Sequence, residues 1–226
     1  MMGYSTEWDQ RYAENAHMST WPWSDLVSYV MRYARPDKSP YNVLELGCGA
    51  GANIPFFLSL NVNYYAIEGS QIIVNKLKKQ FPTIADNIIV GDFTKEINFP
   101  VTFDLIVDRG SLTSNATSDI RKCLKMVRKL MNENAKYVGI GWFSTENSEY
   151  RKGVFVEDEY TRKLIEDGPL SGIGAVHFSN QTHLEDLFQD YKFSVLEHCK
   201  TDRVLPQNSF NNAFWNFIAE QKEGTQ

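Results

Sequence analysis

Apolar runs of strand length alternate along the chain with segments whose apolar residues follow a helical spacing. Five runs, rich in β-branched and aromatic residues, lie at 42–46, 64–67, 88–90, 103–107 and 136–140. Residues 71–81 and 118–131 instead place apolar side chains three or four positions apart. Because parallel strands need long crossovers, usually helices, this alternation predicts an α/β fold with a mostly parallel sheet covered on both faces.

The segments outside this core follow other patterns. Residues 24–33 favour a helix that ends before Pro36, and another helix is expected to begin near residue 179 or 182. Residues 193–196 and 214–218 favour two late strands, one of which is expected to pair antiparallel at the sheet edge. Residues 143–174 are rich in glycine, with a charged helical piece expected near 157–165. They are interpreted as an insertion over one edge of the sheet.

Length, composition and charge narrow the class of protein. The 226 residues predict a single domain over 1–226, and shares of 42% hydrophobic and 23% charged residues are typical of a folded chain. The chain has a formal net charge of -5 and so lacks the excess of basic residues that is usual in nucleic-acid-binding domains. Three cysteines match neither a disulfide framework nor a metal-ligand spacing, so no metal is expected. Without a secretory signal or a membrane-length apolar stretch, a cytoplasmic protein with no membrane partner is expected.

A glycine-rich loop, within the sequence VLELGCGAGAN at residues 43–53, follows the first predicted strand. Gly47, Gly49 and Gly51 allow a sharp turn and a close approach to a ligand, because they have no Cβ. Cys48 lies inside the loop, where a small side chain fits. The helix that follows would offer its N-terminal N–H groups to an anionic group. The loop alone also satisfies the dinucleotide pattern G-x-G-x-x-G/A, and it would equally suit tight packing of strand on helix.

Acidic residues near the ends of the first three strands help to decide between nucleotides. Glu45 precedes the glycines within its strand, where a carboxylate would face a cationic ligand group and would repel a pyrophosphate. Glu68 closes the second strand and could accept both hydroxyls of a ribose. Asp92 closes the third strand and could accept from an exocyclic amine, beside Phe93, which could stack on a purine. All three carboxylates would meet in the crevice at the carboxyl ends of the strands.

The segments ELGCGAGAN, IEGS, GDF and FDLIVDRGSL resemble, in order and spacing, the successive motifs of class I S-adenosylmethionine-dependent methyltransferases. The resemblance covers about residues 41–143. It implies a Rossmann-like fold, a seven-stranded mostly parallel sheet with an antiparallel edge strand and helices on both faces. It also implies S-adenosylmethionine as cofactor, with its methionine part on Glu45 and the glycine loop. Glu68 would take the ribose hydroxyls, while Asp92 and Phe93 would hold the adenine.

Aromatic residues gather before the first strand, in the segments STEWDQRYAE and STWPW. Residues 1–40 are interpreted as a helical cover over the cofactor, in which Arg11 would pair with the methionine carboxylate through a forked contact. Related methyltransferases often carry a similar W-x-x-x-Y segment, here from Trp8 to Tyr12. The same aromatics could instead fill a surface groove, and both interpretations can hold together.

The fourth strand ends in the sequence DRGS, beside the expected position of the transferred methyl group. Asp108 could lie against the cofactor there and could position or deprotonate an acceptor, and Arg109 could bind an anionic one. A local salt bridge or loop hydrogen bond is the alternative for both residues. His177 follows the insertion and could serve as a base, with a purely structural histidine as the alternative.

The chain lacks the motifs of several other methyltransferase classes, and this limits the classes of methyl acceptor to consider. Near residues 108–111 the chain lacks the [DNS]-P-P-[YFW] motif of DNA amino-methylases and the Pro-Cys nucleophile of cytosine C5 enzymes. No obvious carboxylate cluster resembles that of metal-dependent catechol methylases. We therefore expect methyl transfer to an oxygen or nitrogen of a small molecule, such as a sugar or other metabolite, and no nucleic-acid partner.

Three other functions stay open at this point. One is an NAD(P)-dependent oxidoreductase that uses the same glycine loop, another is a methyltransferase-like binding protein without turnover, and the third is methylation of a protein. In each case the chain is expected to divide into four parts. These are the cover at 1–40, the cofactor-binding core at 41–143, a substrate lid at 144–185 and a C-terminal strand pair at 186–226.

Overall fold

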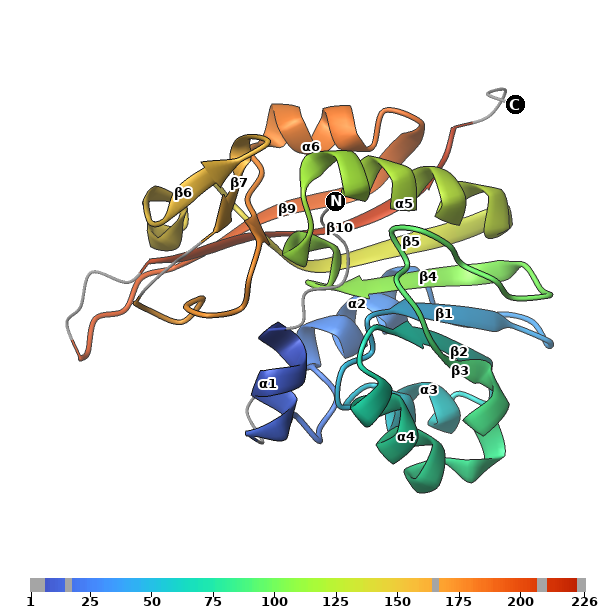
Figure 1. Cartoon of the computed structure of the whole chain (residues 1–226). Coiled ribbons are helices and arrows are strands. Elements are labelled where there is room, and N and C mark those ends of the chain that lie inside the picture. Colours follow the sequence, from blue (N-terminus) through green and yellow to red (C-terminus); the bar gives the residue numbers. More distant parts are fainter. Residues whose placement is uncertain (1–6, 15–17, 164–166, 207–210, 223–226) are drawn as a thin grey trace.

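The computed structural model describes residues 7–14, 18–163, 167–206 and 211–222. Its main sheet has seven strands in the order β3-β2-β1-β4-β5-β10-β9 (Figure 1). The strands are β1 (Asn42–Leu46), β2 (Asn63–Glu68), β3 (Ile88–Val90), β4 (Phe103–Arg109), β5 (Met131–Phe143), β9 (Tyr191–Thr201) and β10 (Asn212–Gln221). Strands β1 to β5 pair in parallel, whereas β10 pairs antiparallel with both β5 and β9. The predicted fold is confirmed, and β10 lies one place in from the edge strand β9.

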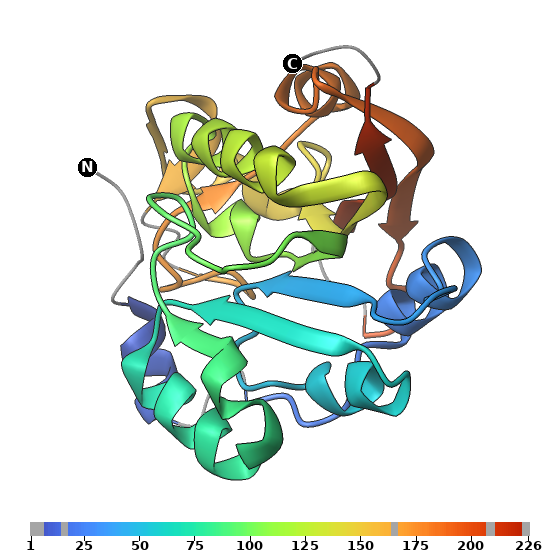
Figure 2. The same ribbon diagram turned by 90° about the vertical axis from the view of Figure 1, so that its right-hand side faces the viewer.

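Helices cover both faces of this sheet (Figures 1 and 2). One face packs against α2 (Ser24–Tyr33), α3 (Ile54–Ser59) and α4 (Gln71–Gln80), and the other against α5 (Thr117–Leu130) and α6 (Gln181–Leu187). Successive side chains of a strand point to opposite faces. Leu105 and Val107 therefore join the core under α2, α3 and α4, while Ile106 between them joins the core under α5 and α6. The same alternation directs the polar residues at the strand ends.

Short 3-10 helices lie in the connections of this core. They are η1 (Pro82–Asn87), which leads into β3, η2 (Leu112–Ser114), which follows β4, and η3 (Ser148–Arg151), which opens the insertion. No helix among the described residues combines the length and the apolar character needed to cross a bilayer.

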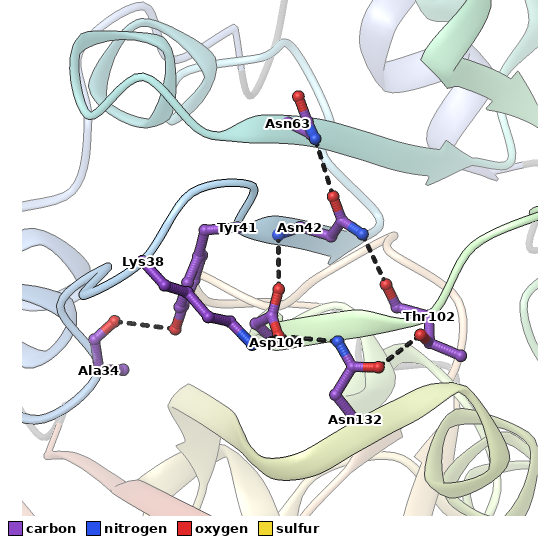
Figure 3. Close-up of polar contacts among 8 residues, drawn as sticks. All are labelled: Ala34, Lys38, Tyr41, Asn42, Asn63, Thr102, Asp104 and Asn132. Atoms are coloured by element: carbon purple, nitrogen blue, oxygen red, sulfur yellow. Dashed lines mark hydrogen bonds and ion pairs between the residues drawn. The ribbon is translucent and has the colours of Figure 1, made fainter.

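A polar network ties the strands together at the end of the sheet opposite the glycine loop (Figure 3). The carboxylate of Asp104, which is 6% exposed, accepts from the Asn42 backbone N–H at 2.8 Å and from Asn132 Nδ2 at 2.7 Å. It also forms an ion pair with Lys38 at 2.8 Å. These contacts join the starts of β1, β4 and β5, and they satisfy a carboxylate that would be costly to bury alone.

The insertion forms a second, three-stranded sheet, and this finding corrects the helix expected near residues 157–165. Strand β7 (Asp158–Lys163) pairs antiparallel with β6 (Val154–Val156) and β8 (Val176–His177). Partners on both sides override the local helical pattern, because strand formation depends on neighbours that are distant in sequence. Residues 164–166 of that prediction lie outside the described part of the chain.

A side chain of the insertion caps helix α5. The N-cap of this helix is Ala116, although Thr117 and Ser118 have the side chains preferred at such a position. The Glu157 carboxylate instead accepts from the Ser118 backbone N–H at 2.9 Å and from the Ser118 hydroxyl at 3.0 Å. Glu157 lies in the turn between β6 and β7, with φ of 70°. The small sheet is therefore fastened to the core at the positive end of the α5 dipole.

Helix α1 (Glu7–Ala13) connects the N-terminal segment to both the core and the insertion. Asp9 accepts from the hydroxyl of Ser70 at 2.5 Å, and Arg11 donates to the carbonyl of Ser171 at 2.7 Å. Ser70 is the N-cap of α4, while Ser171 belongs to the insertion. Residues 1–6 and 15–17 of the predicted cover lie outside the described residues.

Candidate active site

A cavity of about 630 Å³ opens at the carboxyl ends of the parallel strands. Its walls come from the glycine loop, from the chain just after β2, β3 and β4, and from β5 and β10. Side chains of the N-terminal segment and of the insertion complete it. Open α/β sheets bind ligands at this edge, and the volume lies in the range of roughly 300–1,000 Å³ for small-molecule sites. The cavity is therefore the candidate active site.

Glu45 lies in the wall of the cavity and is 2% exposed. One carboxylate oxygen accepts from Asn53 Nδ2 at 2.8 Å, and the other accepts from the Tyr64 hydroxyl at 2.5 Å. Burial disfavours the charged form and raises the pKa of Glu45 to about 7, although both hydrogen bonds oppose the shift. A positive charge in the cavity would favour the ionised form.

Glu68 holds the glycine loop in its turned conformation. Its carboxylate accepts from the Gly49 N–H at 2.9 Å and from the Ser70 N–H at 3.0 Å. Burial raises the pKa of Glu68, and these backbone donors oppose the shift. One N–H of the loop thus serves a carboxylate of the protein, and Glu68, Gly47, Cys48 and Gly49 line the cavity as a group.

Gly51 differs from Gly47 and Gly49, the other glycines of the loop, because it does not line the cavity. Its φ is +80°, and a Cβ built there would lie 2.5 Å from Leu77 Cδ2 and 3.0 Å from Ile54 Cδ1. Its predicted contact with the cofactor stays a prediction, while its packing on Leu77 and Ile54 is observed. A glycine is needed at this position so that the loop can pack on α4 in a left-handed conformation.

Asp92 and Phe93 follow β3 and line the same cavity. One oxygen of Asp92 accepts from the Thr94 N–H at 3.0 Å and the Thr94 hydroxyl at 2.6 Å, and the other pairs with Lys95 at 2.8 Å. Phe93 lies beside Gly47, since its Cε1 is 3.5 Å from the Cβ position built on that glycine. The turn therefore fixes the Asp92 carboxylate at the cavity wall.

The N-terminal aromatics reach the cavity, but Arg11 does not line it. Trp8 and Tyr12 are part of the wall, and the Tyr12 hydroxyl lies 3.3 Å from the Cβ position built on Gly49. The guanidinium of Arg11 instead donates to Ser171 and fits against Gly172, where a Cβ would be 2.5 Å from Arg11 Nη2. In this conformation Arg11 joins the N-terminal helix to the insertion.

Asp108 is fully buried and does not line the cavity, and its contact with the cofactor or an acceptor stays a prediction. One carboxylate oxygen accepts from the Ser111 N–H at 2.8 Å, the Ser111 hydroxyl at 2.5 Å and the Leu112 N–H at 3.1 Å. The hydroxyl of Tyr137 donates to the other oxygen at 3.3 Å. Burial raises the pKa of Asp108. Because Asp108 follows Val107, it points toward the α5 side of the sheet and organises the loop after β4.

Arg109 points to the opposite face and lines the cavity. Its guanidinium carbon lies 3.5 Å from the centroid of the Trp23 ring, a cation–π contact. Nε of Arg109 is buried and has no hydrogen-bond partner in the described segments. Within the described part of the chain no ion pair involves Arg109. Burial lowers the pKa of Arg109, and the charges of Asp25, Glu45 and Asp108 oppose this shift.

His177 is also fully buried and does not line the cavity, and its role as a catalytic base stays a prediction. Its Nδ1 lies 3.2 Å from the Thr161 hydroxyl, and its Nε2 lies 3.3 Å from the Ser179 hydroxyl and 3.2 Å from His183 Nε2. The His183 ring stacks on Tyr160 with centroids 3.5 Å apart. Burial lowers the pKa of His177 well below its ordinary value. The pair joins the small sheet to α6.

Two residues without a predicted role, Asn53 and Tyr64, organise the site. Asn53 connects two parts of it, because its amide donates to Glu45 while its oxygen accepts from the Trp23 N–H at 3.3 Å. Tyr64 reaches Glu45 because both side chains lie on the same face of neighbouring parallel strands. The alternation of each strand could have placed Tyr64, but no sequence pattern joins Trp23 to Arg109.

The charged residues of the wall favour a cationic ligand. Among the described residues that line the cavity, Arg109 is the one lysine or arginine, and the acidic ones are Asp25, Glu45, Glu68 and Asp92. No group of three His, Cys, Asp or Glu among the described residues could hold a metal ion.

Comparisons with known proteins agree with this architecture. Residues 44–137 match the family model of a methyltransferase domain. No curated protein matches the chain. Two solved structures of S-adenosylmethionine-dependent methyltransferases share the fold. The protein from Methanosarcina mazei is 12% identical, with a TM-score of 0.65 and coverage of 89% of this chain and 98% of its own. The protein from Clostridium acetobutylicum is 15% identical, with a TM-score of 0.62 and coverage of 95% and 96%.

The same fold also occurs in a protein that is not described as a methyltransferase. A protein from Rhodobacter sphaeroides, described as a Zn-dependent alcohol dehydrogenase, is 10% identical, with a TM-score of 0.66 and coverage of 96% of this chain and 99% of its own. At such identities a structural likeness shows the fold alone. The fold therefore does not decide between a methyltransferase and a dehydrogenase. That choice depends on the matched domain and on the residues of the cavity.

Proposed function

Because the chain carries the domain and the fold of class I S-adenosylmethionine-dependent methyltransferases, we propose that it transfers a methyl group from S-adenosylmethionine to an oxygen or nitrogen of a small molecule. The enzyme class and the cofactor rest on the matched domain, which spans the glycine loop and the carboxylates of β1 to β3. The choice of a small molecule, and of oxygen or nitrogen, is the part that the cavity supports and that experiment must test.

The acidic wall carries the proposal. S-adenosylmethionine presents a sulfonium and an ammonium group, and Glu45, Glu68 and Asp92 offer three carboxylates in one cavity. A dinucleotide would place two phosphates against the same loop, where Glu45 would repel them. The Gly49 N–H, which could have bound a phosphate, already donates to Glu68. This arrangement favours S-adenosylmethionine over NAD(P).

We assign the cofactor-binding residues by position in the wall. Glu45, with Gly47, Cys48 and Gly49, would contact the methionine part, and Glu68 would accept from the ribose hydroxyls. Asp92 and Phe93 would hold the adenine, with Asp92 already fixed by Thr94 and Lys95. Trp8 and Tyr12 would close the cavity over the bound cofactor.

Positioning can supply most of the catalysis. In methyl transfer a lone pair of the acceptor attacks the methyl carbon, the carbon–sulfur bond breaks and its electrons stay on a neutral sulfide. Holding the acceptor atom at about 3–3.5 Å in line with that bond lowers the barrier without charge development on the protein. Asp108 and His177 are fully buried and do not line the cavity, which supports a transfer in which neither accepts a proton. An amine or an already ionised oxygen is therefore the acceptor atom that this site favours.

The deciding experiment is titration calorimetry of the purified protein with S-adenosylhomocysteine and NADH in parallel. Preferential binding of S-adenosylhomocysteine is expected, and preferential binding of NADH would refute the proposal. Glu68→Ala should weaken S-adenosylhomocysteine binding by about 1.5–3 kcal/mol, which is about tenfold to hundredfold in affinity. Asp104→Asn, at the opposite end of the sheet, is the control and should bind like the wild type. Transfer of labelled methyl groups to a metabolite extract would then identify the acceptor.

A further inference from the structure

Arg109 is a cation held ready in the cavity wall. The aromatic face of Trp23 supports its guanidinium, and the backbone of Trp23 is in turn held by Asn53. No hydrogen bond or ion pair within the described residues uses the donors of Arg109, and its Nε is buried. A stacked guanidinium keeps its donor edge available, and that fork matches a carboxylate or a phosphate.

Nε of this guanidinium is buried and unpaired among the described residues, which is costly for the protein alone. Buried polar groups are almost always hydrogen-bonded, and a desolvated charge needs a partner. The nearby carboxylates of Asp25 and Glu45 favour the charged form but form no ion pair with it. Asp25 instead accepts from the N–H of Leu26 at 2.8 Å, and both Glu45 oxygens accept from neighbours. A bound anion would satisfy the Arg109 donors that the described residues leave open.

The order of the strands sets Arg109 apart from the three carboxylates predicted to bind the cofactor. Glu45 lies in β1, Glu68 ends β2 and Asp92 follows β3, whereas Arg109 ends β4, and β5 and β10 lie beyond it. That further side of the cavity is lined by four apolar side chains, those of Phe143, Leu170, Ile173 and Phe214, and by Asn212. Gly141 of β5 adds space there, because a Cβ built on it would meet nothing within 4 Å. A hydrophobic body with one charged end would fit this half of the cavity.

We propose that the methyl acceptor is an anion, an apolar or aromatic molecule whose carboxylate or phosphate group is bound by Arg109 on the Trp23 platform. The proposal rests on the proposed methyltransferase function and adds the class of substrate. The apolar body would lie against Phe143 and Phe214, and the atom to be methylated would face the cofactor. Arg109 is then a specificity-determining residue of the acceptor site.

The test uses three small probes that share one aromatic ring: para-fluorobenzoate, para-fluorophenyl phosphate and neutral para-fluorobenzamide. Each is titrated into the full-length protein saturated with S-adenosylhomocysteine, and binding is followed by fluorine NMR. At least one anion should bind about tenfold or more tightly than the amide, the scale of charge-assisted hydrogen bonds. The better anion identifies the group as carboxylate or phosphate. Equal affinity for amide and anions, or no anion binding at millimolar concentration, would overturn the proposal.

Substitutions tie the preference to the residue. Arg109→Gln should abolish the preference for the anion, while Arg109→Lys should retain part of it, because the charge remains but the fork is lost. The affinity of each variant for S-adenosylhomocysteine is the control for correct folding. It should stay within about twofold of the wild-type affinity. An anion preference that survives in Arg109→Gln would overturn the proposal.

One further comparison separates the acceptor from the cofactor. If Arg109 instead held the cofactor's carboxylate, Arg109→Gln would weaken S-adenosylhomocysteine but not methylthioadenosine, which lacks the amino-acid part. That result would also overturn the proposal, while leaving the methyltransferase function in place. Failure of the wild type to bind S-adenosylhomocysteine would instead refute the proposed function itself.

Discussion

Glu45→Gln is expected to weaken cofactor binding and to remove much of its dependence on pH. The carboxylate of Glu45 is buried, and its two hydrogen bonds come from Asn53 and Tyr64. A glutamine keeps the length of the side chain and an oxygen that can accept from one of these donors. The substitution therefore removes the charge that would face the cationic methionine part with little change in packing.

The size of the effect follows from the raised pKa. A cationic ligand that binds only the ionised form has an apparent affinity proportional to the ionised fraction of Glu45. With a pKa of about 7, that fraction falls from about 0.9 at about pH 8 to about 0.1 at about pH 6. Wild-type affinity should therefore fall about tenfold over this interval. At about pH 8 the wild type should bind about tenfold to hundredfold more tightly than Glu45→Gln.

Titration calorimetry with S-adenosylhomocysteine at several pH values measures this difference. The ratio of wild-type to variant affinity is the useful quantity, because the cofactor's own amino group titrates equally in both experiments. The ratio should fall about tenfold between about pH 8 and about pH 6. A constant ratio above one would show that Glu45 binds the cofactor without titrating in this range. A ratio of one throughout would refute the contact itself, and Asp104→Asn should follow the wild-type profile.

Three further predictions concern stability and are measured by urea denaturation. Asp108→Ala removes the acceptor of three donors in the loop after β4 and should lower the free energy of unfolding by about 2–4 kcal/mol. An unchanged stability would contradict its structural role. Asp104→Ala should lower the free energy of unfolding by about 2–3 kcal/mol at neutral pH. Since contacts with Lys38 and the Asn42 and Asn132 donors lower the pKa of Asp104 despite its burial, that contribution is complete above its ordinary value of 3.8. It is lost as the pH falls through the lowered pKa, so wild type and variant should converge in acid. Burial lowers the pKa of His183 from 6.5 to about 4, so between these pH values the unfolded chain binds a proton that the folded protein does not. The free energy of unfolding should therefore decline as the pH falls from 6.5 toward 4. His183→Gln should flatten this decline, and equal slopes would count against the assignment.

Local patterns of the sequence carried most of the fold. The first three strands, the helices at residues 24–33 and 71–80 and the glycine loop lie close to their predicted positions. Each depends on neighbours within a few residues: apolar spacing for the helices, β-branched runs for the strands and the glycines for a left-handed turn. Glu45, Glu68 and Asp92 meet in one cavity because parallel strands present their carboxyl ends at the same edge.

Tertiary structure decided which side chains at the carboxyl ends of the strands border the cavity. Strand alternation alone separates Asp108 from Arg109, but only the packing of α5, Trp23 and the insertion determines which of them borders the cavity. The strand at residues 158–163 and the Glu157 cap of α5 likewise depend on partners far away in the chain. The sequence by itself therefore determined a cofactor-binding α/β domain, because its motifs are local. The acceptor side was decided by long-range contacts, because its wall is assembled from segments between residues 23 and 214 that no spacing rule relates.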